Sequence, residues 1–143
     1  MKYVVDTNIF NKLVDGSLLI DQLPSDGQMV ATHIQIDELN NTRDSERRAK
    51  LFLRFSKIAP EIVPTESVVL DVSRFDEAKW SDGELFQKLK NDLDAMNGGK
   101  QNNTQDALIA EVAIVNCFTL LTSDFHLSEV VKRNGANVIY FAT

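Results

Sequence analysis

Short apolar runs typical of buried strands alternate with longer segments of helical periodicity along the chain. Five strands are predicted, over residues 2–5, 28–31, 61–63, 118–122 and 138–141, with helical segments between them. No repeat, low-complexity tract or linker interrupts the alternation. It predicts one α/β domain over residues 1–143, a three-layer sandwich in which a parallel sheet is flanked by helices.

Local signals indicate where several helices begin and end. Asp15-Gly16 stops the first helix, and Asn97-Gly98-Gly99 stops a later one. Thr32-His33-Ile34-Gln35 and Ser81-Asp82-Gly83-Glu84 both fit a capping box, in which the first side chain caps the helix and the fourth reaches back. Further helices are predicted over residues 65–79, 104–117 and 127–134.

The composition is that of a globular protein, with 43% apolar and 25% charged residues, which argues against a disordered or fibrous chain. The longest apolar runs are a few residues, so no membrane span is predicted. The N-terminus lacks the apolar core of a secretory signal. The single cysteine, Cys117, lies in an apolar segment and is expected to be buried. We therefore expect a cytoplasmic protein.

The net charge of −6 argues against a nucleic-acid partner, but the basic residues are unevenly distributed. Residues 43–57 contain six basic and two acidic side chains, so the rest of the chain carries a charge of −10. Apolar residues recur here at helical spacing, which leaves the basic side chains for the opposite side. That side is either a solvated face or a surface for RNA, formed by Arg43, Arg47, Arg48, Arg54 and Lys57.

Four acidic residues are predicted to meet at one edge of the sheet. Asp6 and Asp124 follow the first and fourth strands, Glu38 lies in the helix after the second, and Asp106 lies in the first turn of a later helix. Ligands of parallel α/β sheets collect at this carboxyl edge. Each acid alone could be a helix cap, a first-turn acid or a solvated side chain. Those roles do not explain why three strand–helix junctions supply acids at the same end.

These acids lie, in order, in the stretches VVDTNIF, IQIDEL, NNTQDALIAEVAIV and LLTSDFHL, which together resemble the four acidic motifs of a PIN domain over the whole chain. DALIAEVA followed by LLTSD is the most specific part. The resemblance implies a five-stranded parallel sheet flanked by helices. It also implies that the chain is similar to VapC-type toxin ribonucleases, with an antitoxin protein as partner and a homodimeric assembly. By the same resemblance the catalytic carboxylates are Asp6, Glu38, Asp106 and Asp124, supported by Asn8 and Thr122.

Clustered carboxylates repel one another unless a cation neutralises them, and Mg²⁺ or Mn²⁺, as one or two ions, would suit oxygen ligands. We expect Asp6, Asp106 and Asp124 to bind metal directly. Glu38 is expected to bind it through water or to orient the attacking water. The expected reaction is hydrolysis of an RNA phosphodiester, which by family analogy leaves a 5′-phosphate and a 3′-hydroxyl.

Several further residues have an ordinary role as the preferred interpretation. His33 and His126 could contact substrate but are expected to be cap or surface residues, because neither has a His or Cys at ligand spacing. Asp37 is rotated about 100° from Glu38 on a helix, so only one of them can face the site. Trp80 and Phe86 are expected in the core, although they could form a partner groove. The polar loop Lys100–Asn103 could gate substrate.

Two other acidic α/β classes fit the sequence poorly. A phosphoacceptor receiver domain needs an Asp after the third strand and a Lys after the fifth, but residues 60–65 offer only Glu61 and no Lys follows Phe141. A haloacid-dehalogenase-type phosphatase needs a second Asp where Asn8 stands. The stronger alternative is a PIN-like module that binds RNA or protein without cutting.

Overall fold

The computed structural model describes residues 1–67 and 83–142. The helix expected over residues 65–79 falls mostly outside these residues. Trp80 and the first two residues of the second expected capping box also lie outside them.

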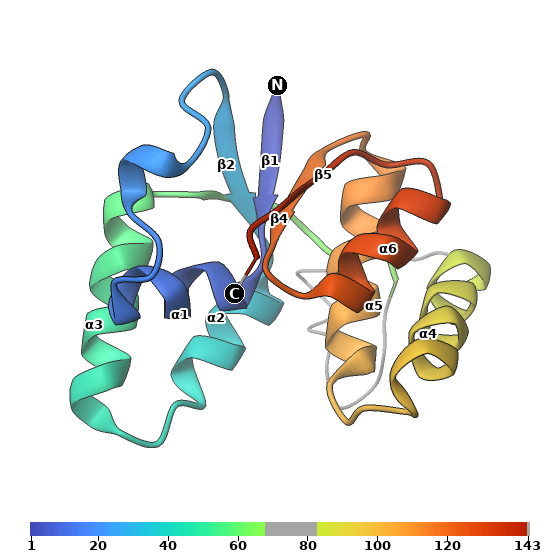
Figure 1. The fold of residues 1–143 in the computed structure, drawn as a ribbon, viewed down its shortest axis with the longest axis horizontal. Helices are drawn as coiled ribbons and strands as arrows, with labels where there is room; N and C mark the ends of the chain where they lie inside the picture. The colour runs from blue at the N-terminus through green and yellow to red at the C-terminus, as the bar shows by residue number, and fades with distance from the viewer. Residues whose placement is uncertain (68–82, 143) are drawn as a thin grey trace.

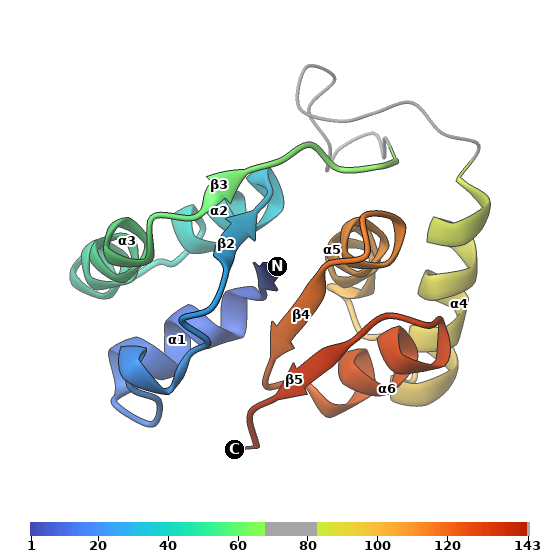
Figure 2. The same cartoon turned by 90° about the horizontal axis from the view of Figure 1, so that it is seen from above.

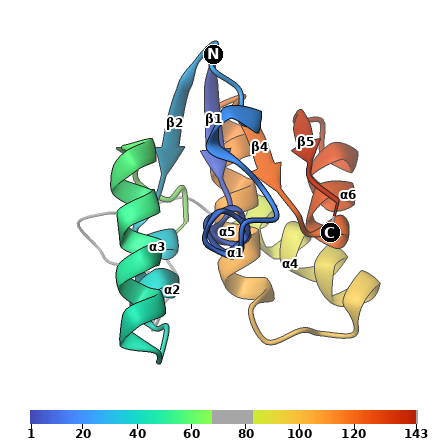
Figure 3. The ribbon, with the colours of Figure 1, turned by 60° about the vertical axis from the view of Figure 1, so that its left-hand side comes forward.

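Five parallel strands form one sheet at the centre of the molecule (Figures 1 and 3). The strands are β1 (Lys2–Val5), β2 (Gln28–Ala31), β3 (Glu61–Ile62), β4 (Thr119–Thr122) and β5 (Val138–Tyr140). Their order across the sheet is β3-β2-β1-β4-β5, and every neighbouring pair is parallel. The predicted α/β class with a five-stranded parallel sheet is confirmed.

Helices cover both faces of the sheet, as Figure 2 shows from above. On one side lie α1 (Thr7–Asp15) and α3 (Ser45–Ile58), and on the other lie α4 (Glu84–Asn97), α5 (Asn103–Val115) and α6 (Phe125–Arg133). A 3₁₀ turn, η1 (Ile20–Gln22), follows α1, and α2 (His33–Asn40) follows β2. The predicted three-layer arrangement is therefore present.

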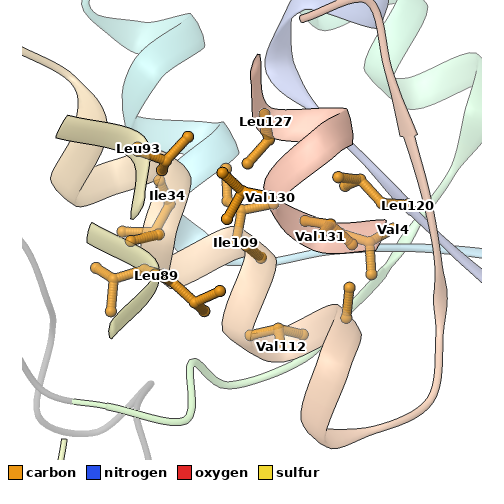
Figure 4. Packing of buried hydrophobic residues seen from close by; sticks show 14 of the residues in the cluster. Val4, Ile34, Leu89, Leu93, Ile109, Val112, Leu120, Leu127, Val130 and Val131 are labelled. Atoms are coloured by element: carbon orange, nitrogen blue, oxygen red, sulfur yellow. The ribbon is translucent and has the colours of Figure 1, made fainter. Parts of the chain in front are cut away.

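Two hydrophobic clusters, one on each face, hold the layers together. The cluster shown in Figure 4 joins α4, α5 and α6 to the sheet through residues such as Leu89, Ile109 and Val130. The second cluster joins α1 and α3 to the other face. Helix α2 contributes Ile34 to the first cluster and Leu39 to the second. It therefore packs against both layers, at the edge of the sheet where the strands end.

Helix boundaries follow the sequence signals at three of four places, including the end of α4, where Gly98 is left-handed at φ 74°. Gly16 ends α1 in the left-handed conformation, at φ 77°, and Thr32 caps α2 in the expected capping box with Gln35. The start of α4 differs from the one predicted by the second capping box, of which Ser81 and Asp82 lie outside the described residues. Helix α4 begins at Glu84, after Gly83, which has φ 76° and makes no side-chain cap bond. A left-handed residue cannot continue a right-handed helix, so α4 starts two residues later than the box implied.

Cys117 is exposed, which corrects the expectation of a buried thiol. The residue has φ 57° and lies between the end of α5 and the start of β4. The chain reverses there to enter the sheet, and the apolar neighbours of Cys117 in the sequence belong to the elements on either side of that turn. Within the described ranges, no helix has the length and apolar character needed to cross a membrane.

Candidate active site

The order of the strands reverses between β1 and β4. From β1 the chain moves outward to β2 and β3, and it then returns to place β4 and β5 on the other side. Parallel α/β proteins bind ligands at the carboxyl ends of the strands that flank such a switch point. Asp6 directly follows β1, and Asp124 lies two residues beyond β4. The topology therefore brings these two acids to the position where a ligand is expected.

Asp6 is buried and held by hydrogen bonds to both carboxylate oxygens. The backbone N–H of Thr7 donates to Oδ1 over 2.8 Å. At Oδ2 the carboxylate accepts from Thr122 Oγ1 at 2.7 Å and from Asn8 Nδ2 at 3.0 Å. Asp6 also caps α1, which is the ordinary role that the sequence allowed for it. Because three donors fix it, Asp6 is the most rigidly oriented acid of the site.

Glu38 reaches the same edge because α2 is tied to the end of β1. The buried Gln35 side chain donates from Nε2 to the Val5 carbonyl over 3.1 Å. One turn further on, Thr7 Oγ1 donates to Glu38 Oε1 over 2.9 Å. Glu38 and Asp6 are electrostatic neighbours, while Asp37 contributes to the pKa of neither. The roles of Thr7 and Gln35 in placing Glu38 were not predicted from the sequence. The position of Thr7, directly after Asp6 at the start of a helix, is the signal that could have pointed to it.

Asp106 is buried in the first turn of α5, where it lacks hydrogen-bond donors like those that hold Asp6. No described residue donates a hydrogen bond to its carboxylate. The start of α5 is anchored by Asn103, which donates from Nδ2 to Asp94 Oδ1 at 2.7 Å and to Asn97 Oδ1 at 2.8 Å. The helix that carries Asp106 is thus fixed, while the Asp106 carboxylate has no donor in the part of the chain that the structure describes.

Asp124 has a structural and an electrostatic role at once. It caps α6, because Oδ1 accepts from the Leu127 N–H over 3.2 Å. Its own N–H donates to Thr122 Oγ1 over 3.0 Å, so Thr122 links Asp124 to Asp6. Asn8 adds a second link, since its Oδ1 accepts from the Ser123 N–H. Asn8 and Thr122 therefore connect Asp6 to the segment that carries Asp124.

The electrostatics show that the four acids share one site. Burial and then the charge of Asp124 raise the pKa of Asp6 to about 6, although the hydrogen bonds from Thr122, Thr7 and Asn8 lower it. Burial and then the charge of Asp6 raise the pKa of Glu38 to about 7. Burial and then the charges of Asp6, Glu38 and Asp124 raise the pKa of Asp106 to about 9, which Lys100 opposes. Among the described residues, the exposed Lys100 is the cation whose charge acts on Asp106.

The chemistry of the donor set fits a hard divalent cation, since every acid offers carboxylate oxygen. The placement of the side chains is less complete. In the described residues, no three Asp, Glu, His or Cys side chains already form a group able to hold an ion. Asp6, Glu38 and Asp124 each have an oxygen engaged by a protein donor. Side-chain movement would therefore be needed for all four to meet at an ion.

The basic side chains proposed for RNA are spread along α3 and the connection before it. Arg47 donates to Asp15 Oδ1 at 2.7 Å and to Asn11 at 2.8 Å, and Arg48 donates to the Thr42 carbonyl. These two guanidinium groups are used within the protein. The remaining candidates, which form no ion pair within the described ranges, are Arg43, Arg54 and Lys57.

Lys57 lies at the wrong edge of the sheet for contact with the acids. It lines a cavity of about 600 Å³ together with Gln28 and Met29, which are the first residues of β2. The acids lie beyond the opposite, carboxyl ends of the strands. Arg43, in the connection between α2 and α3, is placed nearer the end of α2 that follows Glu38.

The two histidines and Phe86, which were considered for further roles, lie on α2, α6 and α4. His33 is a buried residue at the start of α2, and its environment is internal instead of at the surface. Phe86 packs against the α4–α6 cluster, as expected of a core residue. His126 lies beside Phe125, with 6.0 Å between the ring centroids.

Comparisons with known proteins bear on the fold. The sequence matches no family model and no curated protein. Solved structures do match. VapBC2 from Rickettsia felis, bound to a DNA fragment from its promoter, has a TM-score of 0.62 at 19% identity over 98% of each chain. A domain of a functionally unknown protein from Methanocaldococcus jannaschii has a TM-score of 0.55 at 17% identity, covering 99% of this chain and 91% of that one.

The comparisons show the fold of the protein. The chain has the PIN-like α/β fold that it shares with the VapBC2 structure over nearly its whole length. The resemblance of the four acidic motifs to a PIN domain is thus confirmed as a likeness of fold. The roles of the individual acids rest on the site geometry described above.

Thr122→Val is expected to destabilise the protein by about 1–3 kcal/mol, because it removes a donor to Asp6 and the acceptor of the Asp124 N–H in a buried place. Urea unfolding at neutral pH measures this loss. Thr119→Val is the matched control, since Thr119 lies in the same strand, is also buried and makes no side-chain hydrogen bond within the described ranges. Equal stability of the two variants would show that Thr122 does not hold the site together.

Proposed function

We propose that the protein is a metal-dependent ribonuclease that hydrolyses RNA phosphodiester bonds at the edge formed by Asp6, Glu38, Asp106 and Asp124. The observation that carries this proposal is the buried Asp106, which has three acids as electrostatic neighbours and no donor among the described residues. A buried carboxylate in that setting becomes charged only when a cation accompanies it. The oxygen-only donor set favours Mg²⁺ or Mn²⁺, as one or two ions.

Asp106, Asp6 and Asp124 would bind the ion. Asp106 would be the acid most free to do so. When bound, the ion supplies Lewis-acid activation of the phosphate and of a water molecule. Asp6, fixed by three donors, would be the ion's ligand whose orientation is set in advance by the protein. Glu38 keeps Oε1 on Thr7, and Oε2, to which no described residue donates a hydrogen bond, would accept a proton from the attacking water. A pKa of about 7 suits a general base near neutral pH. By analogy with the family, the products carry a 5′-phosphate and a 3′-hydroxyl.

A non-cleaving module that binds RNA or protein is the second candidate. The observation that favours it is the absence, in residues 1–67 and 83–142, of a ready-made group of three ligands for a metal ion. An acidic edge whose carboxylates cannot converge would still attract a basic segment of a partner. The two candidates differ in one respect, since only the nuclease requires the acids to meet at an ion.

Incubation of the purified protein with a structured RNA separates the two functions. A nuclease cleaves the RNA with Mn²⁺ or Mg²⁺ and stops when EDTA removes the ion. Its products carry 5′-phosphates, which a phosphatase can remove. A binding module retards the RNA on a native gel and leaves its length unchanged. RNA that is cut equally in EDTA would exclude the metal-dependent site.

We further propose that the protein is the toxin of a toxin–antitoxin pair, a cytoplasmic homodimer inhibited by a small partner protein. The fold shared with the VapBC2 structure and the four acidic motifs support this assignment. The acidic edge would accept a helix or a basic side chain of the antitoxin. Expression of the chain together with the gene beside it should yield a complex of two proteins. Light scattering should give twice the 16.1 kDa mass of the chain for the free protein.

A further inference from the structure

Three aromatic rings form a row at the start of α6 and the end of β5. The Phe125 ring centroid lies 6.1 Å from that of Tyr140, at an angle of 74° between the ring planes, and 6.0 Å from that of His126. Phe125 is 54% exposed and Tyr140 is 37% exposed. Neither ring belongs to a hydrophobic cluster of the core. Their packing inside the protein therefore does not explain why two large rings are placed here.

The aromatic row lies next to the acids. Tyr140 pairs with Thr122 in the sheet, one strand spacing of about 4.8 Å away, and Thr122 donates to Asp6. Phe125 follows Asp124 directly and is the first residue of α6. Along the carboxyl edge of the sheet, the rings therefore lie beyond the acids, on the side of the edge strand β5.

We propose that Phe125 and Tyr140 form a stacking platform for a base of single-stranded RNA, beside the phosphodiester cleaved by the acids. This inference rests on the proposed function and names the form of its substrate. Proteins hold unstacked RNA bases on exposed aromatic rings, whatever the base, because each base has a π-face. A base next to the scissile bond would reach rings that adjoin Asp124.

The charge of the site explains why stacking is needed. Four acids repel the RNA backbone, and in residues 1–67 and 83–142 Lys100 is the cation whose charge acts on Asp106. Arg47 and Arg48 donate to groups of the protein itself, and Lys57 lies at the opposite edge of the sheet. Stacking contributes affinity that does not depend on charge, so it can hold a nucleotide at an acidic edge.

The size of the aromatic row favours a base over a protein surface. At their exposed fractions, the two rings offer roughly 200 Å². A stable protein interface needs about 800 Å² from each partner. Ile139 of β5 is also exposed, but it points to the opposite face of the sheet from Tyr140, because side chains alternate along a strand. Leu53 on α3 and Ile62 on β3 are exposed on other elements. The area is suited to one or two bases.

Fluorescence anisotropy with a labelled single-stranded RNA of about 12 nucleotides tests the platform. The measurement uses protein that carries Asp106→Asn, so that the RNA stays intact. Adding Phe125→Ala is expected to weaken binding about 10-fold, and Tyr140→Ala is expected to weaken it several-fold. Phe125→Trp should retain the affinity because it keeps a stacking face. An RNA of equal length without bases should bind weakly and equally to all variants.

Leu53→Ala is the matched control, since Leu53 is 63% exposed and lies on α3, away from the acids. It should leave RNA binding unchanged. Equal RNA affinity with and without Phe125→Ala would overturn the platform. So would an equal loss of affinity for the base-free RNA. A change of oligomeric state in Phe125→Ala and Tyr140→Ala, with unchanged RNA binding, would assign the rings to a protein interface and also overturn it.

Cleavage by otherwise wild-type protein separates this inference from the proposed function. With Phe125→Ala, KM for the RNA should rise about 10-fold and kcat should stay within about 2-fold. Unchanged KM in a protein that cuts RNA would overturn the platform and leave the nuclease in place. Loss of RNA binding in a protein that never cuts would support the platform and remove the nuclease.

Discussion

Metal-free protein that carries Asp106→Asn is expected to be more stable than the wild type at pH 8, by roughly 2–4 kcal/mol. Burial and the three neighbouring acids raise the pKa of Asp106 to about 9, whereas the same group in the unfolded chain ionises near pH 4. The folded state therefore keeps a proton that the unfolded state releases. Asparagine has the shape of the protonated acid and removes this difference.

The direction of the pH dependence follows from the same shift. A carboxyl whose pKa is raised on folding contributes its full stability below about pH 4, and that stability is lost as the pH rises toward 9. The advantage of Asp106→Asn should thus be near zero at pH 4 and grow up to pH 9. Urea unfolding in EDTA at several pH values measures it. Asp21→Asn, on the exposed 3₁₀ turn η1, is the control and should show no such growth.

A lower stability of metal-free Asp106→Asn at pH 8 would show that the acids do not repel one another as described. Asp106 suits this experiment better than Asp6. Asparagine at position 6 would turn an NH₂ group toward the donors of Asn8 and Thr122 and disturb the cap of α1. Asp106 has no hydrogen-bond donor in the described chain, so its replacement breaks no hydrogen bond there.

Mn²⁺ is expected to raise the melting temperature of the wild type by about 8 °C when its concentration is 100 times the dissociation constant. Binding to the folded state alone supplies about 2.7 kcal/mol at that concentration. For a chain of 143 residues, 1 kcal/mol corresponds to roughly 3 °C. Asp106→Asn should reduce the shift to below about 2 °C, because it removes the acid most free to bind the ion.

Thermal unfolding at pH 7.5, with the ionic strength matched by KCl, provides the measurement. Asp21→Asn should keep the wild-type shift, since it removes a carboxylate that lies outside the site. An equal shift in the wild type and in Asp106→Asn would place the ion elsewhere. A wild type that does not respond to Mn²⁺ would favour the non-cleaving module.

The strands and the positions of the four acids could be predicted because local patterns determine them. The apolar runs at residues 2–5 and 28–31 became β1 and β2 with the expected bounds. The box formed by Thr32 and Gln35 set the start of α2, and with it the position of Glu38. Asp6 and Asp124 follow neighbouring parallel strands, so the topology alone brings them to one edge.

The partners of the side chains could not be predicted, because they depend on how separate elements pack. Thr7 holds Glu38 across 31 positions of sequence, and Arg47 is taken by Asp15 across 32. The basic segment looked like one surface, yet α3 carries Lys57 to the amino edge of the sheet, away from the acids. The exposure of Cys117 depends on the turn between α5 and β4, which the apolar pattern does not reveal.

The central claim is that the acids at the carboxyl edge hydrolyse RNA with a divalent ion. The initial rate of RNA cleavage as a function of Mn²⁺ concentration, in wild type and Asp106→Asn, tests it most directly. We predict a saturable rise for the wild type and a rate at least about 1,000-fold lower for Asp106→Asn, which corresponds to several kcal/mol of transition-state stabilisation. Equal rates in the two proteins, or a wild-type rate that does not depend on the ion, would contradict the claim.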